Sequence, residues 1–123
     1  MKSSADFMNE ANAAVPRIPA AEAIAKHNTD AVFVDVRDSG AIAQTGTIAG
    51  AHRIARGMIE FVADAETQFH NAALQKDADI YLVCGAGGQA ALAGKTLKDM
   101  GYQNVTNIGG FGDWKEAGGP TEE

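Results

Sequence analysis

Apolar residues gather in short runs that are separated by glycine-rich or polar stretches. Two of these runs, AVFVDV at 31–36 and IYLV at 80–83, are almost continuously apolar and rich in β-branched residues. Such runs are typical of strands that are buried on both faces, as in parallel sheets. Weaker runs at 51–55 and 105–108 predict two further short strands.

Helical spacing fills much of the chain between these runs. In the segment from Gly88 to Met100, Ala90, Ala93 and Leu97 recur at three- and four-residue steps, and Gly101 is a typical helix stop. Further helices or helical turns are predicted at 19–26, 38–42, 57–74 and 110–117. Strands that alternate with helices predict an α/β fold with a mainly parallel sheet.

The beginning of the chain carries a weaker pattern. Residues 1–14 are predicted to form a mobile segment or a short helix, and residues 15–123 the domain itself. Residues 15–18 are predicted as an edge strand, because Pro16 has no amide hydrogen for a neighbouring strand. The opening residues include Asp6 and lack an apolar core, so they do not resemble a secretory signal.

Composition narrows the class of protein. With 123 residues, 46% of them hydrophobic and 21% charged, the chain fits one globular domain. A net charge of -6 argues against a nucleic-acid or anionic-membrane surface, and no stretch reaches the ~18 apolar residues of a membrane span. One cysteine forms neither an internal disulfide nor a thiolate metal cluster, and the three histidines lack metal-ligand spacing and are expected at surfaces or turns. We therefore expect a soluble cytoplasmic protein.

The only cysteine, Cys84, stands where the second apolar run ends and a loop almost without side chains begins, in YLVCGAGGQAALAG. In parallel sheets, functional sites lie beyond the carboxyl ends of the strands. Backbone amides of a glycine-rich loop can form an anion cradle, and the start of the following helix adds roughly half a positive charge. A thiol over this cradle is expected to ionise readily, and the thiolate is the reactive form. The residues alone leave four roles open for Cys84: nucleophile, redox sensor, phosphate-type binder and buried structural cysteine.

Several segments resemble the single-domain rhodaneses, a family of thiosulfate sulfurtransferases. VFVDVRDSG resembles the family's strand-plus-DVR motif, GTIAGAHRI its GHIPGA segment, and YLVCGAGG its active-site strand and loop, in the family's order. RGMIEF and LAGKTLKDMGYQNVTNIGGFGDWKEAGGP resemble other stretches of the family, so the resemblance extends from Val15 onward. It implies a three-layer sandwich, with helices on both faces of a mainly parallel sheet of four to five strands.

The resemblance also implies a mechanism. Cys84 takes a sulfane sulfur from a small anionic donor such as thiosulfate, becomes a persulfide, and passes the sulfur to cyanide or to a thiol acceptor, free or protein-borne. The backbone amides of the loop are expected to bind the substrate and the persulfide. These amides belong to Gly85, Ala86, Gly87, Gly88 and Gln89. No metal or organic cofactor is implied, and the oligomeric state is left open.

The loop departs from the family's pattern at two positions. The family reads Cys-x-x-Gly-x-Arg-Ser, whereas Gln89 stands here in place of the arginine and Ala90 in place of the serine. A guanidinium holds an oxyanion with about 1.5–3 kcal/mol, against about 0.5–1.5 kcal/mol for a neutral amide, so thiosulfate should be held roughly 5–30-fold more weakly. Thr47 and Ala49 replace the histidine and proline of the GHIPGA segment, which is a milder change.

Three charged residues outside the loop are also candidates. Arg56 lies in RGMIEF, a segment that passes near the site in the family, and could supply part of the missing positive charge; the alternative is a solvated surface arginine. Asp35 and Arg37 are expected to form a structural pair that fixes the end of their strand. The aromatic residues expected in the core are Tyr102, Phe111 and Trp114.

Two other functions stay open beside sulfur transfer. A phosphatase of the Cdc25 type also combines a cysteine, a loop and an arginine, but its loop is one residue longer before the arginine, and Ala90 occupies that place here. A non-enzymatic rhodanese-like module would use Cys84 only for binding or redox sensing. Gln89 and Ala90 favour such a module, whereas the cysteine and its glycine-rich loop count against it.

Overall fold

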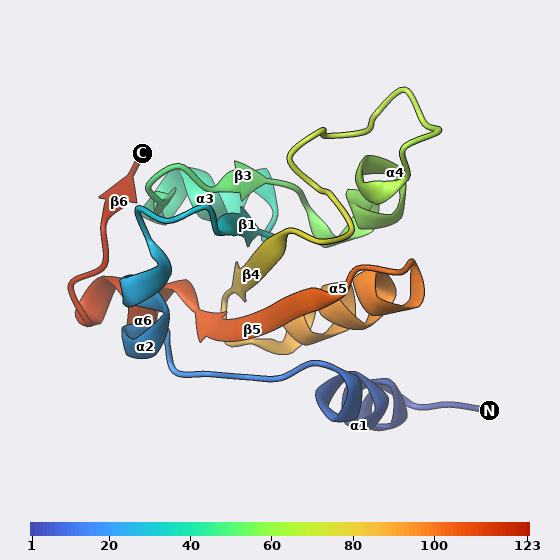
Figure 1. Ribbon diagram of the computed structural model, residues 1–123. Coiled ribbons are helices and arrows are strands. Elements are labelled where there is room, and N and C mark those ends of the chain that lie inside the picture. Colours follow the sequence, from blue (N-terminus) through green and yellow to red (C-terminus); the bar gives the residue numbers. More distant parts are fainter.

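The computed structural model describes all 123 residues, and a sheet of four parallel strands lies at its centre (Figure 1). The strand order is β3-β1-β4-β5. These strands are β1 (Val32–Asp35), β3 (His52–Arg53), β4 (Asp79–Cys84) and β5 (Asn104–Gly110). The two nearly continuous apolar runs of the sequence therefore form the two central strands, as their β-branched composition predicts.

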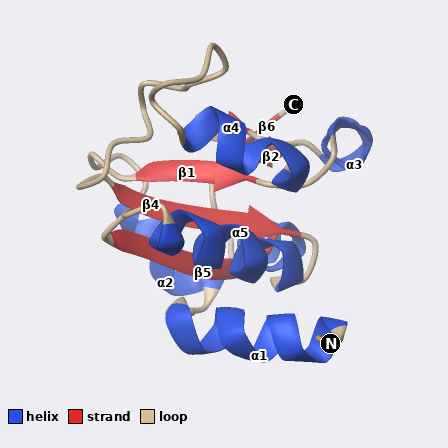
Figure 2. Cartoon of the chain, turned by 90° about the vertical axis from the view of Figure 1, so that its right-hand side faces the viewer, coloured by secondary structure: helices blue, strands red, loops and turns tan.

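Side chains of the central strand β4 alternate between two hydrophobic cores. Ile80, Leu82 and Cys84 belong to one core, and Tyr81 and Val83 belong to the other. Figure 2 shows helices in front of the sheet and behind it. The helices on the first face are α4 (Ile59–Ala63) and α5 (Gly88–Asp99), and those on the second face are α2 (Ala20–Ala23) and α6 (Phe111–Glu116). This arrangement confirms the predicted α/β sandwich.

Of the two predictions for the first residues, the structure shows the helix, α1 (Ser4–Ala14). Ser3 caps it through a reciprocal pair of bonds with Asp6, in which the Asp6 amide donates to Ser3 Oγ (3.2 Å) and the Ser3 amide donates to Asp6 Oδ2 (2.8 Å). The helix lies beside α5 in both views (Figures 1 and 2). The division of the chain at residue 15 stays a prediction.

A glycine on α5 seats the residue that follows α1. A Cβ atom at Gly94 would lie 2.9 Å from both γ-carbons of Val15, which is closer than real side chains pack. Val15 itself is buried in the same core as Cys84. Gly94 therefore leaves a notch into which the start of the next segment docks.

The chain after Val15 runs along the free edge of β5. The Asn107 amide donates to the Pro16 carbonyl (2.9 Å), and the Ile18 amide donates to the Asn107 carbonyl (3.1 Å). Arg17 and Asn107 thus form a parallel bridge. The predicted edge strand at 15–18 is reduced to this single bridge.

Several predicted elements differ in length from those of the structure. The predicted helix at 57–74 is a 3-10 turn (Arg56–Met58) followed by α4, and the chain then proceeds in turns to β4. The predicted turn at 38–42 is a longer helix, α3 (Ser39–Thr45). The elements not predicted are the antiparallel strands β2 (Thr47–Ile48) and β6 (Thr121–Glu122), and α2 continues into a 3-10 turn (Ile24–Lys26). None of the helices combines the length and the apolar character that a membrane crossing requires.

The aromatic core residues are buried as predicted, and all three histidines are half-buried. Tyr102, Phe111 and Trp114 are all buried. His27 is half-buried beside the rings of Phe33 and Trp114, and its Nε2 lies 2.7 Å from the Ala49 carbonyl oxygen. His27 lies in a turn, in agreement with the prediction of histidines at surfaces or turns, and aromatic side chains cover one side of its ring.

Tyr102 ties the turns after α4 to the core. Its hydroxyl donates to the Ala63 carbonyl (2.6 Å) and lies 3.2 Å from the Leu74 carbonyl oxygen. Burial raises the pKa of Tyr102 above its usual 10.0, and the nearby charge of Asp64 adds to the rise. The neutral phenol is therefore the form that the folded protein favours.

This raised pKa predicts a loss of stability in alkali. Above about pH 10, the unfolded tyrosine loses its proton while the folded one keeps it, so the free energy of unfolding falls as the pH rises through the folded pKa. Tyr102→Phe should lower this free energy by about 1 kcal/mol at neutral pH and make its alkaline decline shallower. Urea unfolding of both proteins at neutral and alkaline pH measures the difference. Burial also raises the pKa of Tyr81, so Tyr81→Phe is measured beside them to separate its share of the alkaline decline. An unchanged alkaline slope in Tyr102→Phe would contradict the assignment.

Candidate active site

Cys84 is the last residue of β4, at the carboxyl end of the central sheet. Its side chain points to the face that α5 covers, and the residue is only 1% exposed. On the neighbouring strand, Gly110 pairs with it, and a Cβ atom there would collide with the Gly85 carbonyl oxygen. The sulfur is therefore enclosed by strand, loop and helix.

Two backbone amides donate to the sulfur. The Gly87 amide nitrogen lies 3.0 Å from Cys84 Sγ, and the Ala90 amide nitrogen lies 3.3 Å from it. Gly87 adopts φ +103°, a conformation that L side chains rarely adopt, and this turn aims its amide inward. Both amides are donors aimed at the sulfur, and an anionic sulfur accepts such hydrogen bonds more strongly than a neutral thiol does. The positive end of α5, which begins at Gly88, acts in the same direction.

The other predicted loop residues surround these donors. The amides of Gly85 and Ala86 donate to no group of the protein, and both residues are exposed. Gly88 is partly exposed, and the side chain of Gln89 is exposed and forms no hydrogen bond. The structure thus brings the loop 85–89 to the sulfur, with two unused amide donors at its open side.

Asn107 on β5 also holds the loop, and it is not among the site residues predicted from the sequence. Its Nδ2 donates to the Gly87 carbonyl (2.9 Å), and its Oδ1 accepts from the Gly109 amide (2.8 Å). Pairing shifts between Leu82 and Cys84 of β4, so β5 carries a bulge in which Gly109 adopts φ +83°. A buried asparagine inside an apolar strand is a signal that could have marked this position.

Arg17, from the edge of the sheet, also reaches the loop. Its Nη2 donates to the Ala86 carbonyl (3.2 Å), and its guanidinium packs against the α-carbons of Gly87 and Gly109. Arg17 takes part in none of the five ion pairs of the protein. Nothing in the sequence connects this residue with Cys84, because the contact exists only once the edge strand has docked.

Arg56 is not brought to the loop. Its Nη1 donates to Glu60 (3.1 Å), which lies four residues further on, and its Nη2 donates to the Thr96 hydroxyl (3.1 Å). Thr96 lies eight residues beyond the start of α5, or about 12 Å along the helix. An ion pair within its own segment thus directs Arg56 away from the place of the missing arginine.

Asp35 and Arg37 form a buried pair at the end of β1. Arg37 donates to both carboxylate oxygens, with an Nη2–Oδ2 distance of 2.7 Å, and the Thr47 hydroxyl donates to the same carboxylate (2.7 Å). Arg37 also lies over the Phe111 ring, 4.7 Å from its centroid. These contacts connect β1, β2 and α6, and neither side chain contacts the cysteine loop.

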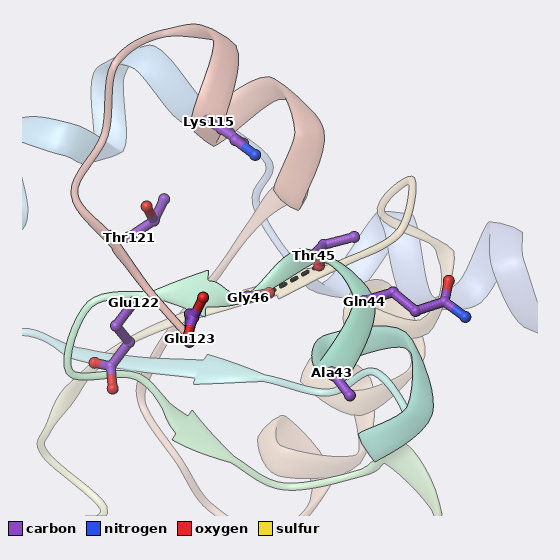
Figure 3. Close-up of a pocket in the computed structure, with 8 residues that line it drawn as sticks. All are labelled: Ala43, Gln44, Thr45, Gly46, Lys115, Thr121, Glu122 and Glu123. Atoms are coloured by element: carbon purple, nitrogen blue, oxygen red, sulfur yellow. Dashed lines mark hydrogen bonds between the residues drawn. The ribbon is translucent and has the colours of Figure 1, made fainter.

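Cys84 does not line any of the surface cavities. One cavity of about 500 Å³ opens between α3, α6 and β6, and Thr45, Lys115 and Glu122 are among its lining residues (Figure 3). No cysteine or histidine lines it. None of the five cavities is lined by residues 84–89. We place the candidate site at Cys84 on its chemistry, and a small donor must approach over the exposed backbone of Gly85 and Ala86.

Known proteins share this architecture. The chain superposes on a protein of unknown function from Rhodopseudomonas palustris CGA009, described as a possible tyrosine phosphatase, with a TM-score of 0.91, 37% identity, and coverage of 99% of this chain and 96% of that one. It is also similar to the polysulfide-sulfur transferase homodimer of Wolinella succinogenes, with a TM-score of 0.70, 25% identity, and coverage of 94% and 83%.

A curated relative and a family model agree with these structures. Over 55 residues, the chain is 44% identical to the adenylyltransferase and sulfurtransferase UBA4 of Candida albicans; the match covers 44% of this chain and only 13% of that protein. Residues 19–117 match the model of the rhodanese-like domain. The match spans four fifths of the chain and contains β1, β4, the cysteine loop and α5, and on this ground the chain belongs to the rhodanese-like domain family.

Proposed function

We propose that this protein transfers a sulfane sulfur through a persulfide on Cys84. The observation that supports the proposal best is the pair of amides, from Gly87 and Ala90, that donate to Cys84 Sγ. They favour the anionic sulfur that a nucleophile needs, and no side-chain base is required. Membership of the rhodanese-like family and the sulfurtransferases among its relatives support sulfur transfer in general.

The reaction consists of two successive nucleophilic displacements at sulfur. The Cys84 thiolate attacks the outer sulfur of thiosulfate, the sulfur–sulfur bond breaks, and sulfite leaves with the bonding electron pair. Cyanide or an acceptor thiolate then attacks the terminal sulfur of the persulfide, and the Cys84 thiolate leaves. No net oxidant is consumed, and no metal or organic cofactor takes part.

The loop suits the loaded intermediate as well as the free thiolate. A persulfide extends roughly 2 Å beyond the cysteine sulfur. The unused amides of Gly85 and Ala86 lie at the exposed side of the loop, where they can donate to the terminal sulfur or to a departing anion. We propose small anionic sulfur donors and thiol acceptors as the substrates. We place the protein in the cytoplasm, where such thiols stay reduced.

The first test is the mass of the protein after it meets a donor. Wild type incubated with thiosulfate, or separately with polysulfide, should gain the mass of one sulfur atom and lose it again when cyanide is added. Cys84→Ser should gain nothing, since the hydroxyl does not take up sulfane sulfur. If wild type gains no sulfur from either donor, the buried cysteine belongs to a non-catalytic module instead.

The position of the missing arginine gives a second test. Gln89→Arg should lower the KM for thiosulfate, by roughly 5–30-fold, because a guanidinium binds an oxyanion more strongly than a neutral amide does. Gln44→Arg is the matched control, because it adds the same charge at an exposed position on α3. Steady-state assays with thiosulfate and cyanide measure both variants. An unchanged KM in Gln89→Arg would reject this assignment of position 89.

A phosphatase is the second candidate, because the Rhodopseudomonas palustris relative is described as a possible tyrosine phosphatase. Gln89 offers less to a dianionic phosphate than an arginine would, and residues 85–89 include no cationic side chain of their own. We expect no Cys84-dependent hydrolysis of p-nitrophenyl phosphate under conditions in which thiosulfate and cyanide are turned over. Hydrolysis that Cys84→Ser abolishes would favour the phosphatase.

A further inference from the structure

One peptide group connects Arg17 to the sulfur. On its carbonyl side, the oxygen of Ala86 accepts a hydrogen bond from Arg17 Nη2 (3.2 Å). On its amide side, the nitrogen of Gly87 donates to Cys84 Sγ (3.0 Å). A cationic donor at the carbonyl oxygen polarises the peptide and strengthens the donor character of its N–H. The charge of Arg17 therefore acts on the sulfur across a single peptide plane.

The surroundings of Arg17 leave its charge available for this role. Arg17 is exposed, and none of the ion pairs includes it. The Asp113 carboxylate lines the same cavity as Arg17 but forms no ion pair with it. The bridge to Asn107 fixes its backbone at the edge of β5, and Figure 1 shows this segment running beside that strand. The guanidinium is thus held by backbone pairing, and not by an acidic partner.

Two glycines make room for the guanidinium. A Cβ atom at Gly87 would lie 2.9 Å from Arg17 Nη2, and one at Gly109 would lie 3.0 Å from the same nitrogen. Any side chain at these positions would displace Arg17 or the loop. Both residues also adopt positive φ, so glycine serves the backbone and the approach of Arg17 together.

We propose that Arg17 is the cationic positioning residue of the cysteine loop and that it replaces, from outside the loop, the charge that Gln89 lacks. It acts through the Ala86–Gly87 peptide, which it orients and polarises, and it thereby favours the anionic state of Cys84. Asn107 holds the next carbonyl, that of Gly87, but the amide of that peptide belongs to Gly88 and does not donate to the sulfur. The inference rests on the proposed function, in which the anionic sulfur is the nucleophile.

The test separates the charge of Arg17 from its hydrogen bond. Arg17→Lys keeps a cationic donor near the Ala86 carbonyl, whereas Arg17→Gln keeps only a neutral one. The rate at which iodoacetamide, an uncharged reagent, alkylates Cys84 is measured at neutral and at alkaline pH. At neutral pH, Arg17→Gln should react roughly three- to tenfold more slowly than wild type, and Arg17→Lys should recover most of the rate.

The alkaline measurement and a remote variant serve as controls. At alkaline pH the thiol is ionised in every variant, so the rates of wild type and Arg17→Gln should converge. Lys26→Gln removes a cation at the amino ends of the strands and should leave both rates unchanged. Thermal unfolding confirms that each variant is folded.

Several results would overturn the inference. Equal slowing in Arg17→Lys and Arg17→Gln that persists in alkali would show a purely structural contact. Equal rates in wild type and Arg17→Gln would show that the charge does not reach the sulfur, and a wild-type thiol that resists the reagent even in alkali could not be the group that Arg17 activates. Because alkylation needs no sulfur donor, these results are independent of whether wild type accepts sulfur in the mass experiment, which tests the proposed function separately.

Discussion

Strand β4 fixes the place of the Cys84 sulfur, because it is hydrogen-bonded along both edges and buried on both faces. It pairs with β1 on one side and with β5 on the other, and its side chains enter both cores. Cys84 continues the alternation that places Ile80 and Leu82 under α5, so its side chain has no route to the opposite face. Only three residues separate the strand from α5, and the first turn of that helix must therefore lie over the sulfur.

Much of the fold follows from local patterns, and the exceptions have physical causes. The β-branched runs predict β1 and β4, and the spacing of alanine and leucine predicts α5, since each pattern continues for long enough to show its period. β2 and β6 have two residues each, which is too short for any period, and they pair only because the chain end returns to α3. Of the one or two helices predicted at 57–74, α4 stops at Ala63, where the backbone of Asp64 is extended. The last carbonyls of α4 accept hydrogen bonds from Thr67, Asn71 and Tyr102, which are contacts that the local pattern does not encode.

The candidate site is likewise predictable from the sequence only in part. The position of Cys84 at a strand end and its glycine-rich loop are readable from consecutive residues. Arg17 and Asn107 reach that loop from other elements, so their roles exist only in three dimensions. Arg56 resembles a site residue in sequence, yet Glu60 on its own segment draws it away. A buried cysteine was one of the alternatives that the sequence left open, and the enclosure of the sulfur is decided only by how α5 and the loop close over it.

Through the proposed role of Arg17, the notch at Gly94 links the reactivity of Cys84 to a distant contact in the core. Val15 fills the space above Gly94, and Arg17 follows only two residues later along a segment that is pinned to β5. A methyl group added at position 94 would press on Val15, and Val15 would have to shift within the segment that carries Arg17. Substitutions at this contact between α5 and the residue after α1 would therefore change the reactivity of the thiol without any change in the loop sequence.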